Sequence, residues 1–63
     1  MFTILVIDDQ QAMCDEYRES FEDAFDDRVK TYSATNGEDG YNLFIEEDNI
    51  DLIIIDIKNK NSI

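Results

Sequence analysis

Two short aliphatic runs, each closed by an aspartate, constrain the fold of this chain more than any other feature of its 63 residues. The first run covers about 2–8 and is closed by Asp8, and the second covers about 51–57 and is closed by Asp56. Neither run alternates apolar with polar residues, which is typical of parallel strands that are covered on both faces. The sequence therefore predicts two buried strands at these positions.

A helical period follows the first run. Met13, Tyr17 and Phe21 recur every four residues, with acidic side chains at many of the positions between them. This spacing predicts an amphipathic helix over about 10–25 with its aromatic stripe turned inward. We expect Phe25, at the end of the same stripe, to lie in the core as well.

The middle of the chain supplies another strand and another helix. Residues 28–34 alternate loosely between apolar and polar, as in an edge strand. Asn36 is a favourable N-cap, and Asp39 follows it three residues later in a pattern like a capping box, which predicts a helix over about 37–47. We expect Phe44 of this helix to be part of the core.

The fold class that follows is α/β, with the order β-α-β-α-β in one small domain over residues 1–63. Alternating strands and helices indicate a parallel sheet with right-handed crossovers. A chain of this length buries only about 60% of the surface that its unfolded form exposes. One cysteine and no histidine exclude an intrachain disulfide or a Cys/His zinc site as a source of extra stability.

Charge narrows the classes of partner. Sixteen acidic residues against five basic ones give a net charge of −11, which argues against binding to nucleic acid or to anionic membranes. The same charge suits a divalent cation or a basic protein partner. No apolar run approaches the roughly 20 residues of a membrane-spanning helix. The lone Cys14 is expected to be a small buried thiol, and it fits a reducing compartment, so we expect a cytoplasmic protein.

Acidic residues follow both aliphatic strands. Asp8 and Asp9 end the first strand and Asp56 ends the last, and ligands of open α/β sheets bind at the carboxyl ends of the strands. If these strands are neighbours, the three carboxylates converge, and a divalent cation such as Mg²⁺ would offset their repulsion. One aspartate would then serve as a nucleophile toward a phosphoryl group. Acids at these positions are also common as helix caps, but a doublet combined with a single aspartate favours a functional site.

Three segments together resemble the receiver domains of response regulators, the phosphoacceptor modules of two-component signalling. The segment 4–10, Ile-Leu-Val-Ile-Asp-Asp-Gln, resembles the first strand of the family. The segment 34–40, Ala-Thr-Asn-Gly-Glu-Asp-Gly, resembles the entry to its second helix. The segment 51–57, Asp-Leu-Ile-Ile-Ile-Asp-Ile, resembles its third strand, which carries the phosphorylated aspartate.

The resemblance implies a role for each matching residue. Asp56 would be the phosphoryl acceptor. Asp9, Asp56 and the backbone carbonyl of Lys58 would hold Mg²⁺ directly, and Asp8 would assist through water. The implied partner is a histidine kinase or a phosphotransfer protein, and the chain would take part in phosphotransfer without being an enzyme in its own right.

The chain departs from the family in two respects. Asn59 and Lys60 stand where receivers usually carry a methionine or leucine followed by a proline. A receiver sheet has five strands in the flavodoxin-like order 2-1-3-4-5. This sequence matches the N-terminal half, without the fourth-strand Ser/Thr and fifth-strand Lys that contact the phosphoryl group. We therefore expect impaired phosphorylation and an apolar third strand that is exposed at the sheet edge and self-associates.

Two alternatives stay open beside the phosphoacceptor interpretation. A degenerate or truncated receiver would act as an interaction or self-association module that does not depend on phosphorylation. An aspartate-nucleophile phosphatase also places acids after its first strand, but that family requires Asp-x-Asp. The acids here, Asp8 and Asp9, are adjacent, which disfavours the phosphatase.

Overall fold

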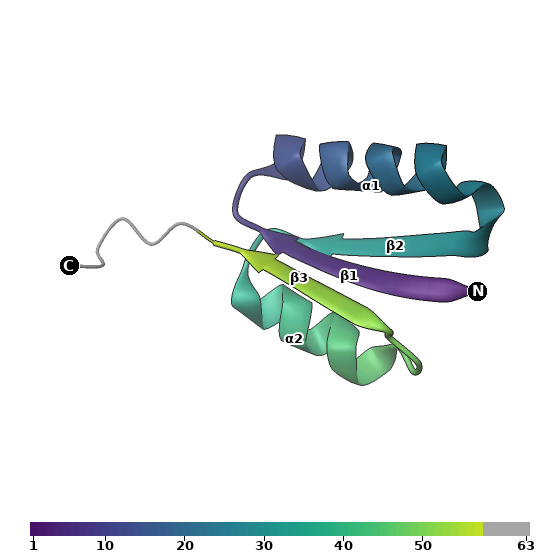
Figure 1. Ribbon diagram of the computed structural model, residues 1–63. Helices are drawn as coiled ribbons and strands as arrows, with labels where there is room; N and C mark the ends of the chain where they lie inside the picture. Colours follow the sequence, from purple (N-terminus) through teal and green to yellow (C-terminus); the bar gives the residue numbers. More distant parts are fainter. Residues whose placement is uncertain (58–63) are drawn as a thin grey trace.

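Strands and helices alternate through residues 1–57, the part of the chain that the computed structural model describes (Figure 1). In chain order the elements are β1 (Phe2–Asp8), α1 (Gln11–Phe25), a short 3-10 turn (Asp26–Arg28), β2 (Val29–Ala34), α2 (Gly37–Glu46) and β3 (Leu52–Asp56). The predicted order β-α-β-α-β is confirmed. The middle strand begins one residue later than predicted because the 3-10 turn occupies Asp26–Arg28.

The three strands form one parallel sheet in the order β2-β1-β3, with β1 at the centre. Ile4 of β1 is the register partner of both Thr31 in β2 and Leu52 in β3. Asp51, just before β3, fixes the start of that strand: its Oδ2 accepts a 2.8 Å hydrogen bond from the backbone N–H of Thr3, and its own N–H donates to the Thr3 carbonyl at 2.8 Å. The predicted α/β fold with a parallel sheet is confirmed.

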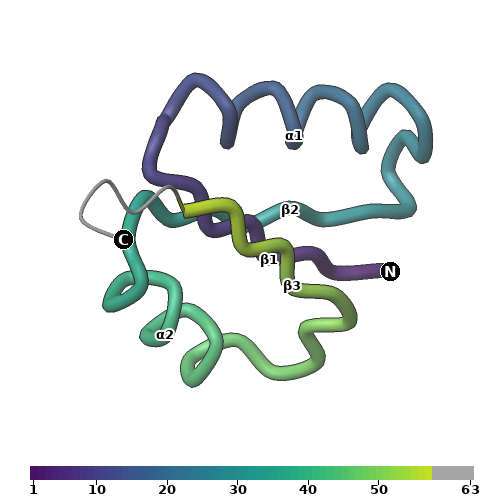
Figure 2. Tube along the Cα trace, turned by 60° about the vertical axis from the view of Figure 1, so that its left-hand side comes forward, coloured from purple at the N-terminus to yellow at the C-terminus, as the bar shows by residue number. Residues whose placement is uncertain are grey.

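One helix covers each face of the sheet, as Figures 1 and 2 show from two directions. Both helices pack over β1 and β2. The third strand therefore has little helical cover, and it forms one edge of the sheet in the described residues. This asymmetry decides which apolar residues are buried.

The core is centred on β1. Ile4, Leu5 and Val6 have at most 2% of their surface exposed, so this strand is buried on both faces as predicted. Ile4 and Val6 face α1, where they form a cluster that Tyr17 and Phe21 complete from the helix. Burying an aliphatic side chain of this kind stabilises the fold by about 1.5–3 kcal/mol, so β1 is the main source of stability among the strands.

The core departs from the sequence pattern at three places. The described residues leave β3 mostly exposed, with Ile55 at 67%, because neither helix covers that strand. Burial of β3, predicted from its aliphatic run, is therefore wrong, and the exposed third strand expected from the comparison with a complete receiver sheet is confirmed. Two aromatic residues expected in the core are exposed as well. Phe25 is also exposed, since it is the last residue of α1. Phe44 is exposed because α2 packs over β1 and β2, so this ring borders an open groove beside β3.

The second helix begins and packs as its sequence indicates. The side chain of Asn36 accepts a 2.8 Å hydrogen bond from the backbone N–H of Asp39, which confirms the predicted N-cap. Gly40 is the only buried residue of the helix, and a Cβ at this position would collide with the side chain of Ile7. A glycine at position 40 therefore lets α2 approach β1 closely.

Candidate functional site

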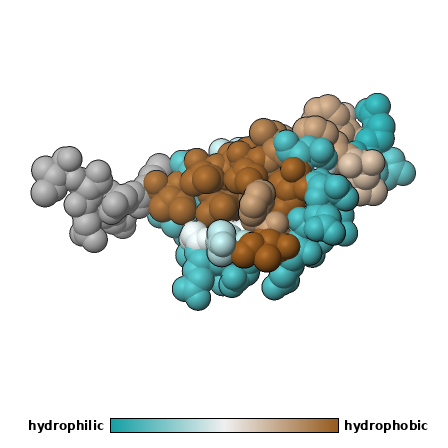
Figure 3. Space-filling model, turned by 90° about the horizontal axis from the view of Figure 1, so that it is seen from below, coloured by the Kyte–Doolittle hydropathy of each residue, from teal (hydrophilic) through white to brown (hydrophobic). Residues whose placement is uncertain are grey.

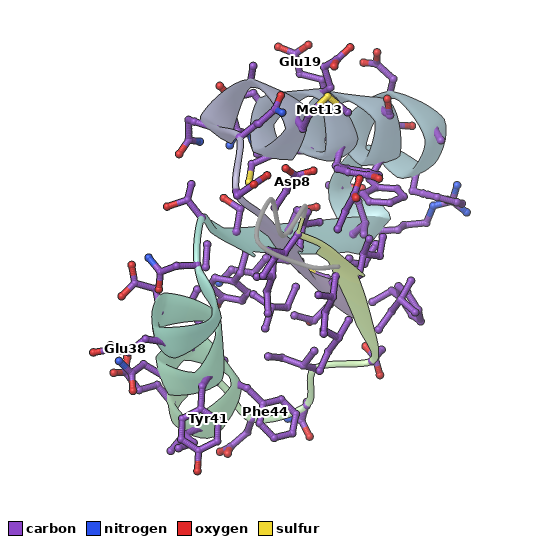
Figure 4. The ribbon with its side chains drawn as sticks, turned by 90° about the vertical axis from the view of Figure 1, so that its left-hand side faces the viewer. Asp8, Met13, Glu19, Glu38, Tyr41 and Phe44 are labelled. Carbon is purple, nitrogen blue, oxygen red and sulfur yellow. The ribbon has the colours of Figure 1, made fainter. Side chains whose placement is uncertain are left out.

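The sheet brings Asp8 and Asp56 side by side. They are register partners at the carboxyl ends of β1 and β3, and adjacent strands lie about 4.8 Å apart. Register partners project to the same face, and Asp8 lies on the α1 face with Ile4 and Val6. Figure 4 shows Asp8 between the sheet and α1. The predicted neighbourhood of the first and third strands is therefore present.

Asp8 is buried and only partly satisfied. It is 2% exposed, and its Oδ1 accepts a 2.9 Å hydrogen bond from the backbone N–H of Gln10. Its Oδ2 is buried without a hydrogen-bond partner among the described residues. A buried polar atom without a partner is costly, and more so when it carries charge. The unpartnered oxygen therefore indicates a position where a cation or a bound water belongs.

The other two predicted acids have different surroundings. Asp9 lies after the end of β1 and is exposed, whereas Asp56 is half-buried at the end of β3. Within residues 1–57, no group of three or more acidic, cysteine or histidine side chains lies close enough to hold a metal ion. The backbone carbonyl of Lys58, the remaining predicted ligand, lies outside the described residues. The structure thus brings two of the predicted ligands, Asp8 and Asp56, next to each other.

Cys14 contacts the backbone of Asp8 from the first helix. It is the only buried residue of α1, and its thiol donates to the carbonyl oxygens of Asp8 at 3.5 Å and Ala34 at 3.6 Å. These weak bonds connect the first turns of α1 to the ends of β1 and β2. The sequence indicated a buried thiol at position 14, and that prediction is confirmed. Its contact with the site was missed because no periodicity links a helix residue to a particular carbonyl.

Backbone hydrogen bonds in the loop between β1 and α1 also position Asp8, which the sequence did not reveal. Gln10 occupies the N-cap position of α1 but makes no side-chain capping bond. Its carbonyl accepts hydrogen bonds from the N–H groups of Met13 and Cys14, while its own N–H donates to Asp8. The position of Asp8 therefore depends on a bond from the backbone, and such a bond cannot be predicted from the residue types.

These observations test whether the residues fit Mg²⁺. Hard cations prefer carboxylate and carbonyl oxygens and keep several waters. Two register-partner carboxylates, one with an unpartnered buried oxygen, supply part of such a ligand set. Among residues 1–57 they do not make a complete site, because no third acidic side chain lies close enough to join them.

No protein-family model, curated protein or solved structure matches this chain. The receiver resemblance therefore stays a prediction that rests on its three motifs. In the described part of the chain, neither helix has the length and apolar character needed to cross a bilayer.

Proposed function

We propose that this chain is a receiver-type phosphoacceptor module in which Asp56 takes the phosphoryl group. One observation supports the proposal above all others: Asp8 and Asp56 are register partners on one face, and Asp8 keeps a buried oxygen without a partner. A stable fold gains nothing from that arrangement, since two like charges approach each other and one of them is desolvated. A buried polar atom without a partner calls for an explanation such as a catalytic role or a bound water or ion.

In the proposed reaction, a carboxylate oxygen of Asp56 attacks the phosphorus of a phosphohistidine on a histidine kinase or phosphotransfer protein. An O–P bond forms, the N–P bond breaks, and the leaving imidazole takes up a proton from solvent. Bound Mg²⁺ would neutralise charge on the transferred oxygens. Asp9, Asp56 and the Lys58 carbonyl would hold the cation directly, and Asp8 would assist through water. A module of this kind would work in the cytoplasm.

A second candidate function is supported by a different observation. The exposed apolar residues of β3 are a typical protein-binding surface, which suits an interaction module that does not depend on phosphorylation. The two functions differ in their dependence on Mg²⁺ and on Asp56, so the same experiment distinguishes them.

The test of the proposed function is a phosphorylation assay with a small acyl-phosphate donor in Mg²⁺, read by intact mass. We expect slow transfer of one phosphoryl group to the wild type, none to Asp56→Asn, and unchanged transfer to Asp23→Asn. Asp23 is an exposed acid of α1, and its variant loses the same charge. Equal labelling of the wild type and Asp56→Asn would refute the assignment of the acceptor.

Metal binding is tested in a separate experiment, because slow phosphoryl transfer would not reveal whether Mg²⁺ binds. A Mg²⁺ titration followed by amide NMR should shift the resonances of Gln10 and Asp56 first, since the Gln10 N–H donates to Asp8. Shifts spread evenly over the acidic surface of α1 would show diffuse ion binding instead. Partner binding that ignores both Mg²⁺ and phosphodonor would favour the interaction module.

A further inference from the structure

The outer edge of β3 has no partner strand among residues 1–57, and it is apolar on both sides. Six exposed side chains line it, and we call them the β3 edge patch: Tyr41, Phe44, Leu52, Ile53, Ile55 and Ile57. On the α2 side a groove of about 310 Å³ runs along the isoleucines of the patch, and on the α1 side a groove of about 440 Å³ opens beside Leu52. Figure 3 shows the hydrophobic side chains gathered in a continuous band on the α2 side.

The opposite edge of the sheet is different. β2 carries Lys30 at an exposed position, with its ammonium 5.0 Å from the ring centre of Tyr32. The side chain of Lys30 is charged near neutral pH, and the contact with Tyr32 raises its pKa further above the ordinary value. Lysine on an edge strand discourages pairing with another chain. The strand β3, by contrast, has no charged residue between Asp51 and Asp56.

We propose that two copies of this chain pair through β3 in antiparallel orientation, about a two-fold axis perpendicular to the sheet and centred on Ile54. The two three-stranded sheets would then join into one sheet of six strands. The unpaired backbone groups of both edges would be satisfied by each other. This proposal does not depend on phosphorylation at Asp56.

The register follows from the symmetry and from the length of the strand. A two-fold axis perpendicular to the sheet keeps each face on its own side, so only residues of the same face can oppose each other. Centring the pair on Ile54 uses all five residues of the strand. Ile53 of each copy then opposes Ile55 of the other on the α2 face, and such β-branched pairs stabilise a ladder.

The same register separates the acidic ends. Each Asp56 opposes Leu52 of the other copy, and the two Asp56 residues lie four positions apart along the strand, or about 13 Å at 3.3 Å per residue. That distance exceeds the Debye length of about 8 Å at physiological ionic strength. A parallel in-register pair would place the two Asp56 residues much closer, so the net charge of −11 favours the antiparallel arrangement.

The surface around β3 is apolar on both faces of the sheet. The β3 edge patch is flanked by the exposed rings of Phe2 and Phe25, which would extend the contact beyond the paired strands. Each partner in an interface of standard size contributes about 800 Å². Both helices pack over β1 and β2, so among the described residues neither blocks the approach of a second β3.

The first test is the molar mass in solution, measured by light scattering after size exclusion from about 1 µM to about 1 mM, the range of weak specific affinities. We expect the 7.4 kDa chain to reach twice its mass. Ile55→Lys should lower the association constant at least 100-fold. Ile45→Lys is the matched control, since Ile45 is an exposed isoleucine of α2 outside both grooves, and it should leave the dimer intact.

The second test measures orientation and works even if the lysine variant fails to fold. Directly opposed residues in an antiparallel pair have Cα atoms about 4.5–5.5 Å apart, within reach of a disulfide. Mixing Ile53→Cys with Ile55→Cys under mild oxidation should give a cross-linked dimer. Each variant alone should cross-link at least tenfold more slowly, because diagonal neighbours are about 7–8 Å apart. Cys14 is buried and stays out of the reaction.

Several outcomes would overturn the proposal. A wild type that is monomeric over the whole range excludes the dimer. A dimer that Ile55→Lys leaves unchanged lies on another surface. Faster cross-linking by Ile55→Cys alone than by the mixture indicates parallel pairing. Growth beyond the dimer would mean that β3 pairs head-to-tail with β2 of the next copy, because such a contact does not close.

Discussion

Replacing Asp8 with asparagine should stabilise this protein in the absence of divalent cations. The exchange keeps the shape of the side chain and an oxygen that can accept the 2.9 Å bond from the Gln10 N–H. It removes a charge from a site that is 2% exposed, where one carboxylate oxygen has no partner among the described residues. It also removes the repulsion from Asp56, its register partner.

The magnitude comes from two opposing contributions. The amide nitrogen of asparagine takes the place of the unpaired Oδ2 and is unpaired as well, so the exchange removes only the additional cost of burying the charge, on the order of 2 kcal/mol. Weakening the bond from Gln10, as its acceptor changes from charged to neutral, loses about 1 kcal/mol. We expect a net gain in the free energy of unfolding of about 1 kcal/mol, which for a chain of this size raises the Tm by about 4–8 °C.

The assay is thermal unfolding followed by circular dichroism, in chelator and then in Mg²⁺, at one fixed protein concentration because association also shifts the Tm. Wild type should gain about 1.4 kcal/mol when Mg²⁺ reaches ten times its Kd, and Asp8→Asn should gain much less. Asp23→Asn controls for the general reduction in negative charge. If Asp8→Asn is less stable than wild type in chelator, or gains as much from Mg²⁺, the account of Asp8 as a strained cation ligand is wrong.

Two further predictions concern α2. Asn36→Ala should lower the free energy of unfolding by about 1 kcal/mol through loss of the N-cap. Asn42→Ala, at an exposed position inside the helix, should leave the free energy of unfolding equal or higher. Equal losses for the two variants in chemical denaturation would show that the N-cap does not stabilise the helix. Gly40→Ala should cost about 1–2 kcal/mol, since overpacking against Ile7 outweighs the better helix propensity of alanine. Gly37→Ala, with open space at its Cβ, should be neutral or stabilising, and a Gly40→Ala variant that matches it would show that Ile7 moves aside freely.

The sequence predicted those parts of the fold that depend on local pattern. The aliphatic run of β1 and the Asn36 cap each carry a signal within a few residues, and both were confirmed. Burial of β3 was predicted wrongly from its aliphatic run, because such a run shows only that a strand can be covered, whereas its exposure was predicted correctly from the strands that a complete receiver sheet would add. Burial of Phe44 was also predicted wrongly. Whether a helix reaches the strand depends on where α2 docks, and the contact between Gly40 and Ile7 sets that position.

The candidate site was also predicted only in part from the sequence. The ends of β1 and β3 located Asp8 and Asp56, since parallel neighbours end at the same side of a sheet. The sequence did not reveal that Asp8 is buried and Asp9 exposed, because which acid is the last residue of the strand is known only from the structure. Asp8 is the last residue of β1 and lies on the same face as Ile4 and Val6, whereas Asp9 follows the strand. The backbone N–H of Gln10 then donates to the inward-facing Asp8 carboxylate.

Because neither helix covers β3, this strand should separate locally from the rest of the sheet. Its pairing to β1 joins residues 48 positions apart, as between Thr3 and Asp51, while few buried contacts hold the strand in place. Amide hydrogens of β3 should therefore exchange with solvent through a detachment that costs less than global unfolding, whereas those of the central strand exchange more slowly. Since Asp56 lies on β3, each detachment would take the proposed acceptor away from Asp8. The proposed phosphotransfer would therefore require β3 to be docked on β1.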